Sequence, residues 1–145
     1  MTVTERITIY IGQLCEQIGV SPDKVYNPKT NAWYFTNGSA TMEVFLTSQK
    51  SWDQQSYTYL RCMSPLCEIP KDIKSQFNLY KTVLAINSAY SGFKISADEE
   101  RGILCIVAER DIRGMDYEEM VTMIDFLGHW ANKLDDFMKA EFPAA

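Results

Sequence analysis

This sequence of 145 residues has only one histidine and no glycine-rich segment. Its one histidine, His129, stands on a predicted helix without an identifiable general-base partner, which favours a surface or packing role over catalysis. Its seven glycines are scattered, whereas a phosphate-binding loop gathers several within a few positions. The acidic segments 98–100 and 135–136 suit a solvated turn and a helix face. We therefore expect no catalytic residue and a protein that is not an enzyme.

Basic clusters and long apolar segments are also missing. The formal net charge of −5 and the isoelectric point of about 4.9 disfavour binding to nucleic acid and to anionic lipid. No apolar run approaches the ~20 residues of a membrane span. Residues 1–12 lack the basic start, continuous apolar centre and cleavage site of a secretory signal. We expect a cytoplasmic protein that binds no nucleic acid and is not inserted in a membrane.

The four cysteines do not form a recognisable metal-binding pattern. Cys15 and Cys105 lie in apolar helix and strand patterns. Cys62 and Cys67 are close in the sequence, but a metal site would need two more ligands at a useful spacing. We expect reduced structural thiols rather than a metal site or a disulfide, and no cofactor.

The first helix is predicted over residues 3–18. Thr2 and Glu5 have the spacing of a capping box, and Gly19 followed by Val20 is typical of a left-handed helix end. Residues 21–31 contain two prolines and two asparagines and indicate a loop, in which a short strand at residues 24–26 is left open.

A β-hairpin is predicted over residues 32–46. Asn37 and Gly38 suit a two-residue type I′ turn, which would pair Phe35 with Ala40 and Trp33 with Met42. One face of the hairpin is then mostly apolar, as expected for a half-buried antiparallel sheet. Its residues are Trp33, Phe35, Ala40, Met42, Val44 and Leu46.

Three further strands follow from alternation and turn residues. Residues 48–55 are polar and indicate a loop with an exposed Trp52. Residues 56–63 are predicted to form a third strand, and residues 64–70 a connector. Residues 93–97 and 103–109 form a second hairpin, and the nearly continuous apolar pattern of 103–109 places that strand at the centre of the sheet.

Two longer helices are predicted at residues 71–88 and at about 116–139. The first has two adjacent apolar faces, so either it is enclosed within its own domain or one face meets another subunit. One face carries Ile73, Phe77, Tyr80, Leu84 and Asn87, and the other carries Leu79, Val83, Ile86 and Tyr90. The second helix begins with an acidic capping box and is roughly 36 Å long, so we expect its end to project or to contact a partner.

The element order is therefore α-β-β-β-α-β-β-α, in a single domain covering residues 1–145. No internal repeat or interdomain linker is present. Hairpins alternate with helices, which predicts the α+β class with an antiparallel sheet packed against helices.

Three segments resemble the YbjN family: residues 79–87 (LYKTVLAIN), residues 92–96 (GFKIS) and residues 102–107 (GILCIV). The acidic-capped helix at residues 116–137 is also similar to that family. YbjN proteins share the fold of the type III secretion chaperones, so the resemblance implies a compact, non-enzymatic bacterial protein, commonly a homodimer. In those chaperones the second helix makes the dimer contact, and partner polypeptides bind as extended segments over hydrophobic patches.

Two hypotheses follow. In the first, the protein is a chaperone-like or regulatory homodimer that binds an unidentified partner polypeptide, with strand addition at a sheet edge as one route. The dimer or partner interface would be formed by Leu79, Val83, Ile86, Met123, Phe126 and Trp130.

In the second hypothesis, a small-ligand or enzymatic site lies between the sheet and the Trp52 loop. A deep polar pocket would favour the second hypothesis, and a flat sheet face lined by Trp33, Met42 and Tyr59 would oppose it.

Overall fold

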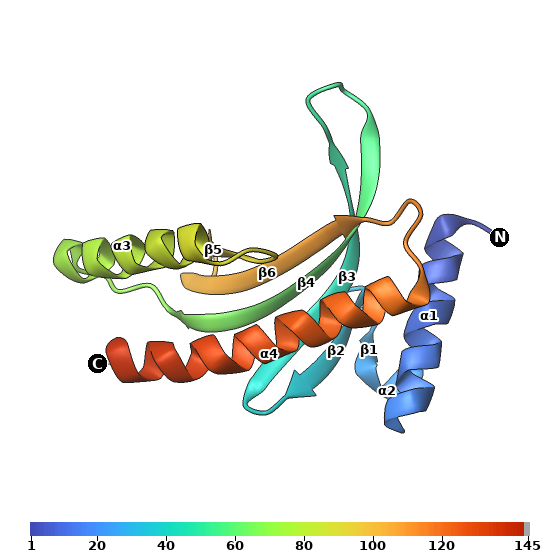
Figure 1. Ribbon diagram of the computed structural model, residues 1–145, viewed down its shortest axis with the longest axis horizontal. Coiled ribbons are helices and arrows are strands. Elements are labelled where there is room, and N and C mark those ends of the chain that lie inside the picture. Colours follow the sequence, from blue (N-terminus) through green and yellow to red (C-terminus); the bar gives the residue numbers. More distant parts are fainter. Residues whose placement is uncertain (144–145) are drawn as a thin grey trace.

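The computed structural model describes residues 1–143, and these residues form one antiparallel sheet covered by helices (Figure 1). The six strands have the order β1-β2-β3-β4-β6-β5. The strands are β1 (Tyr26–Asn27), β2 (Ala32–Asn37), β3 (Ala40–Lys50), β4 (Ser56–Glu68), β5 (Lys94–Asp98) and β6 (Ile103–Asp111). The helices are α1 (Val3–Ile18), α2 (Pro22–Val25), α3 (Ile73–Ala89) and α4 (Tyr117–Glu141). The predicted α+β class is confirmed.

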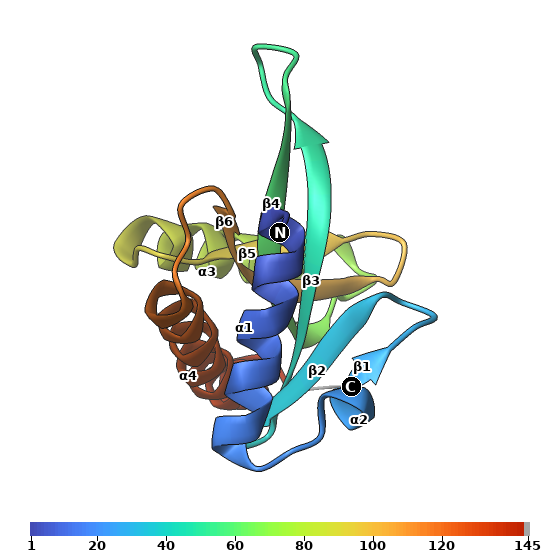
Figure 2. The same cartoon turned by 90° about the vertical axis from the view of Figure 1, so that its right-hand side faces the viewer.

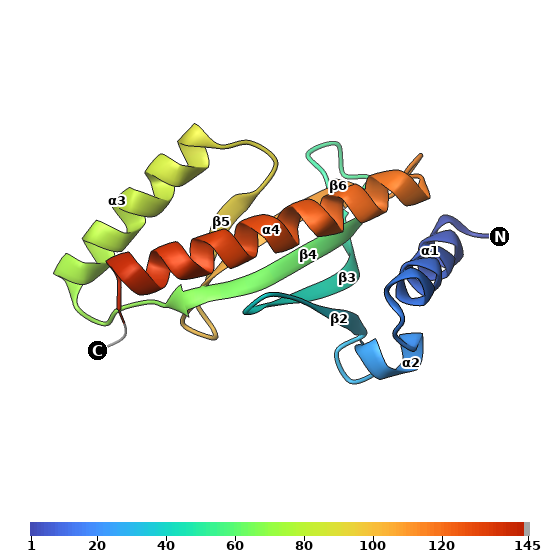
Figure 3. The same ribbon diagram turned by 60° about the horizontal axis from the view of Figure 1, so that its bottom comes forward.

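The core lies between α4 and one face of the sheet. Helix α4 crosses this face and contacts β2, β3, β4 and β6, with α1 beside its first turns and α3 at the other end of the sheet (Figure 3). Six apolar side chains at helical spacing on α4 are all buried: Met120, Ile124, Leu127, Ala131, Leu134 and Met138. The end of α4 therefore does not project from the sheet, in contrast to the expectation from its length, because Met138 is only 1% exposed.

The helix ends follow local rules. Thr2 and Glu5 form the predicted capping box of α1, and Gly19 ends that helix in the left-handed conformation. Asp72 caps α3 by accepting a hydrogen bond from the Ser75 amide, so α3 begins two residues later than predicted. The predicted capping box at the start of α4, between Asp116 and Glu119, is also formed.

The β2–β3 hairpin keeps its predicted faces but not its predicted register. Phe35 pairs with Met42 and Asn37 with Ala40, so the turn residues are Gly38 and Ser39. The type I′ prediction is wrong, because that turn needs a positive φ at both central residues and only Gly38, at 59°, has one. The pairing is shifted by an even number of positions, which leaves each side chain on its predicted face.

Residues 21–31 and 64–70 differ from prediction. Pro22 starts the short helix α2, a favoured position for proline. The short strand left open at residues 24–26 is present as the sixth strand β1, but it lies at Tyr26–Asn27. Residues 64–68 continue β4 instead of forming a connector. Pro65 is tolerated there because it lies beside a register shift and beyond the last residue of β4 that pairs with β3, Met63.

Strands β3 and β4 extend beyond the rest of the sheet. Strand β2 pairs with β3 only as far as Phe45, and β6 pairs with β4 only from Tyr59 onward. Residues 46–58 therefore form a two-stranded projection, here called the arm, which rises clear of the molecule (Figures 1 and 2). The loop predicted at residues 48–55 is shorter, because residues 48–50 belong to β3, and it ends where β4 begins at Ser56.

Candidate protein-binding surfaces

Helix α3 is attached to the sheet edge by one of its two apolar faces. Leu79 and Val83 are buried in the core, with exposed fractions of 0% and 6%. The Asn87 side chain accepts a hydrogen bond from the Ile95 amide (2.8 Å) and donates one to the Ile95 carbonyl (3.2 Å). Asn87 thus satisfies backbone groups of the edge strand β5 as a neighbouring strand would, which holds the second half of α3 in place.

The other apolar face of α3 is exposed apart from its predicted member Asn87, which is bonded to β5. Its exposed residues follow one another at spacings of four, three and four, so they lie on one side of the helix. They are Ile73 (83% exposed), Phe77 (63%), Tyr80 (37%) and Leu84 (68%), and we call them the α3 stripe. A run of exposed large apolar side chains is typical of an interaction site rather than of a solvated helix face.

The structure therefore assigns different positions to the predicted interface residues of α3. Leu79 and Val83 belong to the chain's own core, and Ile86 is half-buried. Hydrophobic periodicity defined both faces of the helix but could not show which of them meets the sheet. The exposed apolar surface of α3 is the α3 stripe.

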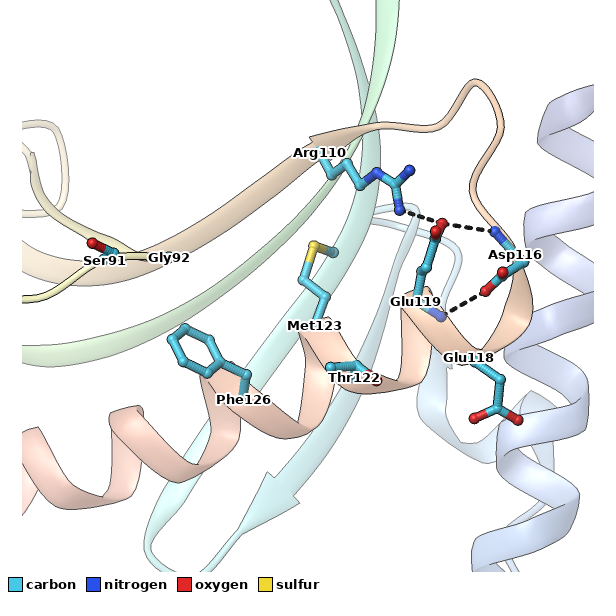
Figure 4. Close-up of a pocket in the computed structure, with 9 residues that line it drawn as sticks. All are labelled: Ser91, Gly92, Arg110, Asp116, Glu118, Glu119, Thr122, Met123 and Phe126. Carbon is cyan, nitrogen blue, oxygen red and sulfur yellow. Dashed lines mark hydrogen bonds and ion pairs between the residues drawn. The ribbon is translucent and has the colours of Figure 1, made fainter.

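Three residues of α4 were predicted to form an interface: Met123, Phe126 and Trp130. They lie in or near a pocket between α4, the end of β6 and the loop between α3 and β5 (Figure 4). Its volume is about 580 Å³. It is lined by Ser91, Gly92, Arg110, Asp116, Glu118, Glu119, Thr122, Met123 and Phe126. We call it the α4 pocket. Met123 and Phe126 form apolar parts of its wall.

Charged groups close one end of the α4 pocket. Arg110 forms an ion pair with Glu119, whose carboxylate also accepts a hydrogen bond from the Asp116 amide at 3.1 Å (Figure 4). The Arg110 guanidinium and the Asp116 amide hold the pKa of Glu119 below its usual range, so this carboxylate is ionised at neutral pH. Asp116 and Glu118 leave the rim acidic.

Trp130 is part of an aromatic cluster rather than a free anchor. Its ring centroid is 4.7 Å from that of Tyr90 and 5.0 Å from that of Phe93, and Phe93 also contacts Phe126. The Lys133 ammonium group lies 5.0 Å from the Trp130 ring centroid. The three predicted residues of α4 are thus brought to one side of the helix, but only Met123 and Phe126 line the pocket.

Gly92 shapes this region through its backbone, so Gly92→Ala is expected to destabilise the protein. Gly92 has a φ of 94°, and a Cβ there would lie 2.9 Å from Cζ of Phe126. Gly102 also has a positive φ, of 65°, but a Cβ there would meet nothing within 4 Å. We expect Gly92→Ala to lower the free energy of unfolding by about 3 kcal/mol and the control Gly102→Ala by about 1 kcal/mol, measured by urea denaturation. Equal losses would show that contact with Phe126 is unimportant.

The arm is ordered by hydrogen bonds within its tip. The Asp53 carboxylate accepts from the Gln55 amide at 3.0 Å and from the Tyr57 hydroxyl at 2.8 Å. The Arg113 guanidinium lies 4.3 Å from the centroid of the Tyr57 ring, so it packs against the arm. Trp52, at the tip, is 93% exposed, which confirms the predicted exposure.

Trp33, Met42 and Tyr59 do not form the single flat sheet face that was expected to oppose a ligand site near the Trp52 loop. Trp33 and Met42 are buried beneath the helices, whereas Tyr59 lies on the opposite face of the sheet. On that face Glu109 forms ion pairs with Arg61 and Lys94. Burial would raise the pKa of Glu109, but these two partners hold it below its usual range. The α4 pocket and a smaller cavity beside α1 are both lined by residues outside the arm.

Residues 1–143 show no metal-binding geometry and no membrane-spanning helix. No three His, Cys, Asp or Glu side chains among them are grouped as metal ligands. None of the described helices is both long and apolar enough to cross a bilayer.

Burial raises the pKa of the Cys62 thiol to about 12, so this cysteine stays protonated and is a weak nucleophile.

The six-stranded antiparallel sheet with its packed helices is the fold of the type III secretion chaperones. The chain is similar to the solved ExsC-ExsE complex at 14% identity, with a TM-score of 0.62 over 100% of this chain and 99% of the other. It is also similar to the Yersinia pestis type III secretion chaperone SycH, solved with a stable fragment of YscM2 (12% identity, TM-score 0.55, 88% and 98% covered). A third match is the heterodimeric ExoU-SpcU complex from the type III secretion system of Pseudomonas aeruginosa (17% identity, TM-score 0.54, 90% and 95% covered).

At these identities the likeness defines the fold. No family model matches the chain, and no curated protein matches it. The resemblance to the YbjN family therefore stays a prediction from the three sequence segments.

Proposed function

We propose that this protein is a non-enzymatic, chaperone-like or regulatory protein that acts as a homodimer and binds an extended segment of a partner polypeptide. The observation that carries the homodimer is the α3 stripe, which exposes large apolar side chains on a helix at one end of the molecule (Figure 1). The fold supports partner binding, because the similar structures are complexes of two proteins, among them the type III secretion chaperone SycH with a fragment of YscM2. We further propose that it is a bacterial, cytoplasmic protein.

The α3 stripe suits a second copy of the same helix. Spacings of four and three residues form the narrow apolar seam by which two helices pack side by side. A two-fold axis through this seam would bring each copy of Phe77 and Leu84 against the other α3 and remove them from water. Partner polypeptides would then bind elsewhere on the sheet or on α4.

The test is the mass of the protein in solution at low micromolar concentration. We expect light scattering to give the mass of two 16.6 kDa chains for the unmodified protein and of one chain for Phe77→Asp, because the new charge would be buried in the seam. Asn78→Asp is the matched control: the neighbouring residue is exposed outside the stripe, and the substitution adds the same charge.

Two results would contradict the dimer proposal. A single-chain mass for the unmodified protein would exclude a micromolar homodimer. A dimer that survives Phe77→Asp would place the contact on a surface other than the α3 stripe.

Partner binding has a separate readout. We expect the tagged protein to retain a bacterial polypeptide from native lysate, and we expect proteolysis of that polypeptide to show protection of an extended segment. A retained small molecule with no polypeptide would favour the ligand-binding alternative.

A further inference from the structure

The arm and the α4 pocket offer complementary chemistry on the same chain. We propose that the Trp52 side chain of one copy occupies the α4 pocket of a second copy. This contact is separate from the α3 seam of the proposed homodimer, since α3 and the arm extend from the molecule in different directions (Figure 1).

Trp52 is presented as a binding anchor. Trp33 is 9% exposed and Trp130 is half-buried within an aromatic cluster, whereas Trp52 is 93% exposed at the end of an ordered arm. Because the tip is already held by the hydrogen bonds of Asp53, little conformational entropy is lost when it docks. Tryptophan is also enriched among the residues that contribute most to protein interfaces.

The α4 pocket has the groups that an indole ring needs. Met123 and Phe126 provide a polarisable sulfur and an aromatic wall, both of which pack favourably against an aromatic ring. Arg110 lines the same pocket and can contribute a cation–π contact. The indole N–H can only donate a hydrogen bond, and the rim carboxylate Glu118 can accept it. The volume of about 580 Å³ lies within the range of pockets that hold bound groups.

Charge also favours this pairing. Lys50 lies two positions before Trp52 on the arm, and Asp116 and Glu118 lie at the rim of the α4 pocket. The acidic residue of the tip, Asp53, is bonded back onto Tyr57 and Gln55 within the arm. A docking arm would therefore bring its lysine toward the acidic rim.

The positions of the arm and pocket suit reciprocal exchange. The arm leaves the sheet where Tyr59 pairs with Asp111, and the adjacent residue Arg110 lines the α4 pocket. Figure 1 shows the arm rising near the end of the sheet at which α4 begins. A two-fold axis near this end could bring each Trp52 to the other copy's pocket, which gives a closed pair rather than an open chain.

The experiment uses full-length protein carrying Phe77→Asp, so that the α3 seam is disrupted. Concentration is raised from the micromolar toward the millimolar range and mass is followed by sedimentation equilibrium. Fluorescence of Trp52 is obtained by subtracting the spectrum of a Trp52→Phe variant. We expect association together with a blue shift and loss of acrylamide quenching for Trp52, because its ring leaves water.

Two further variants separate the arm from the pocket. Trp52→Ala removes the anchor, and Thr122→Arg places a long cation in the pocket from an exposed position of α4. We expect each alone to weaken association at least tenfold. Mixed together, they should form a heterodimer, since one copy supplies an intact pocket and the other an intact arm.

The results distinguish the two contacts. A Phe77→Asp protein that stays monomeric with a quenchable Trp52 overturns the arm proposal and leaves the α3 seam standing. Association that persists unchanged in Trp52→Ala, or a mixture that fails to form a heterodimer, also overturns it. If the unmodified protein is a dimer that Phe77→Asp does not affect but Trp52→Ala dissociates, the arm contact holds and the α3 seam fails.

Discussion

Replacing Val83 with aspartate is expected to lower the free energy of unfolding by about 4 kcal/mol, whereas the same replacement at Leu84 should change it by less than about 1 kcal/mol. Val83 is 6% exposed in the core beside β5, and Leu84 is 68% exposed on the α3 stripe. The buried carboxylate would have no partner and would displace α3 from the sheet. For a domain of this size the difference corresponds to a fall in melting temperature of about 12 °C.

The measurement is urea denaturation of both variants followed by circular dichroism, at a protein concentration low enough to keep both monomeric. Equal losses at the two positions would mean that α3 does not have the orientation described here. Because Val83→Asp disrupts the core, loss of a dimer in that variant would not locate an interface. Leu84→Asp and Phe77→Asp are the informative substitutions for that purpose.

Met138→Ala is expected to lower the free energy of unfolding by about 3 kcal/mol. Phe137→Ala removes a larger neighbouring side chain but should lower it by less than about 1 kcal/mol. Met138 is 1% exposed and Phe137 is 38% exposed, so only the first substitution leaves a cavity. Both lie in the last turns of α4, which the helix length alone suggested would project from the sheet. The pair therefore tests whether the end of α4 is packed on the core.

Thermal and urea unfolding of both alanine variants provide the readout, with circular dichroism to verify that helix content is retained. A small effect at Met138 would indicate that the last turns of α4 are detached in solution. A large effect at Phe137 would indicate that its exposed ring is covered, for example by a second copy.

Local patterns predicted the element types well. The capping boxes at Thr2–Glu5 and Asp116–Glu119 use hydrogen bonds between residues three positions apart, so their sequence spacing was sufficient to place two helix starts. The hairpin faces were also correct despite the wrong register, since an even shift preserves the alternation of strand side chains. The length of the arm was missed, because polar residues 47–50 have no apolar alternation to mark them as a strand.

The candidate surfaces were predicted only in part. Met123 and Phe126 were singled out from helical spacing and do line a pocket, but Arg110 and Gly92 reach the same pocket from β6 and from the loop before β5. Their approach depends on long-range packing, and no spacing in the sequence indicates it. Trp52 was predicted to be exposed because of its polar neighbours, whereas its position at the end of an arm follows from the pairing of β3 with β4 as far as Lys50 and Ser56.

The sequence by itself determined the α+β class, the helix caps and which residues share a face, because these depend on contacts over a few positions or on periodicity. Tertiary structure alone decided which apolar face of α3 is inside. That choice depends on the bonds between Asn87 and the backbone of Ile95 and on the packing of Leu79 and Val83 against the core. A helix with two apolar faces has two possible orientations, and only contact with the sheet edge selects the one that leaves Phe77 and Leu84 exposed.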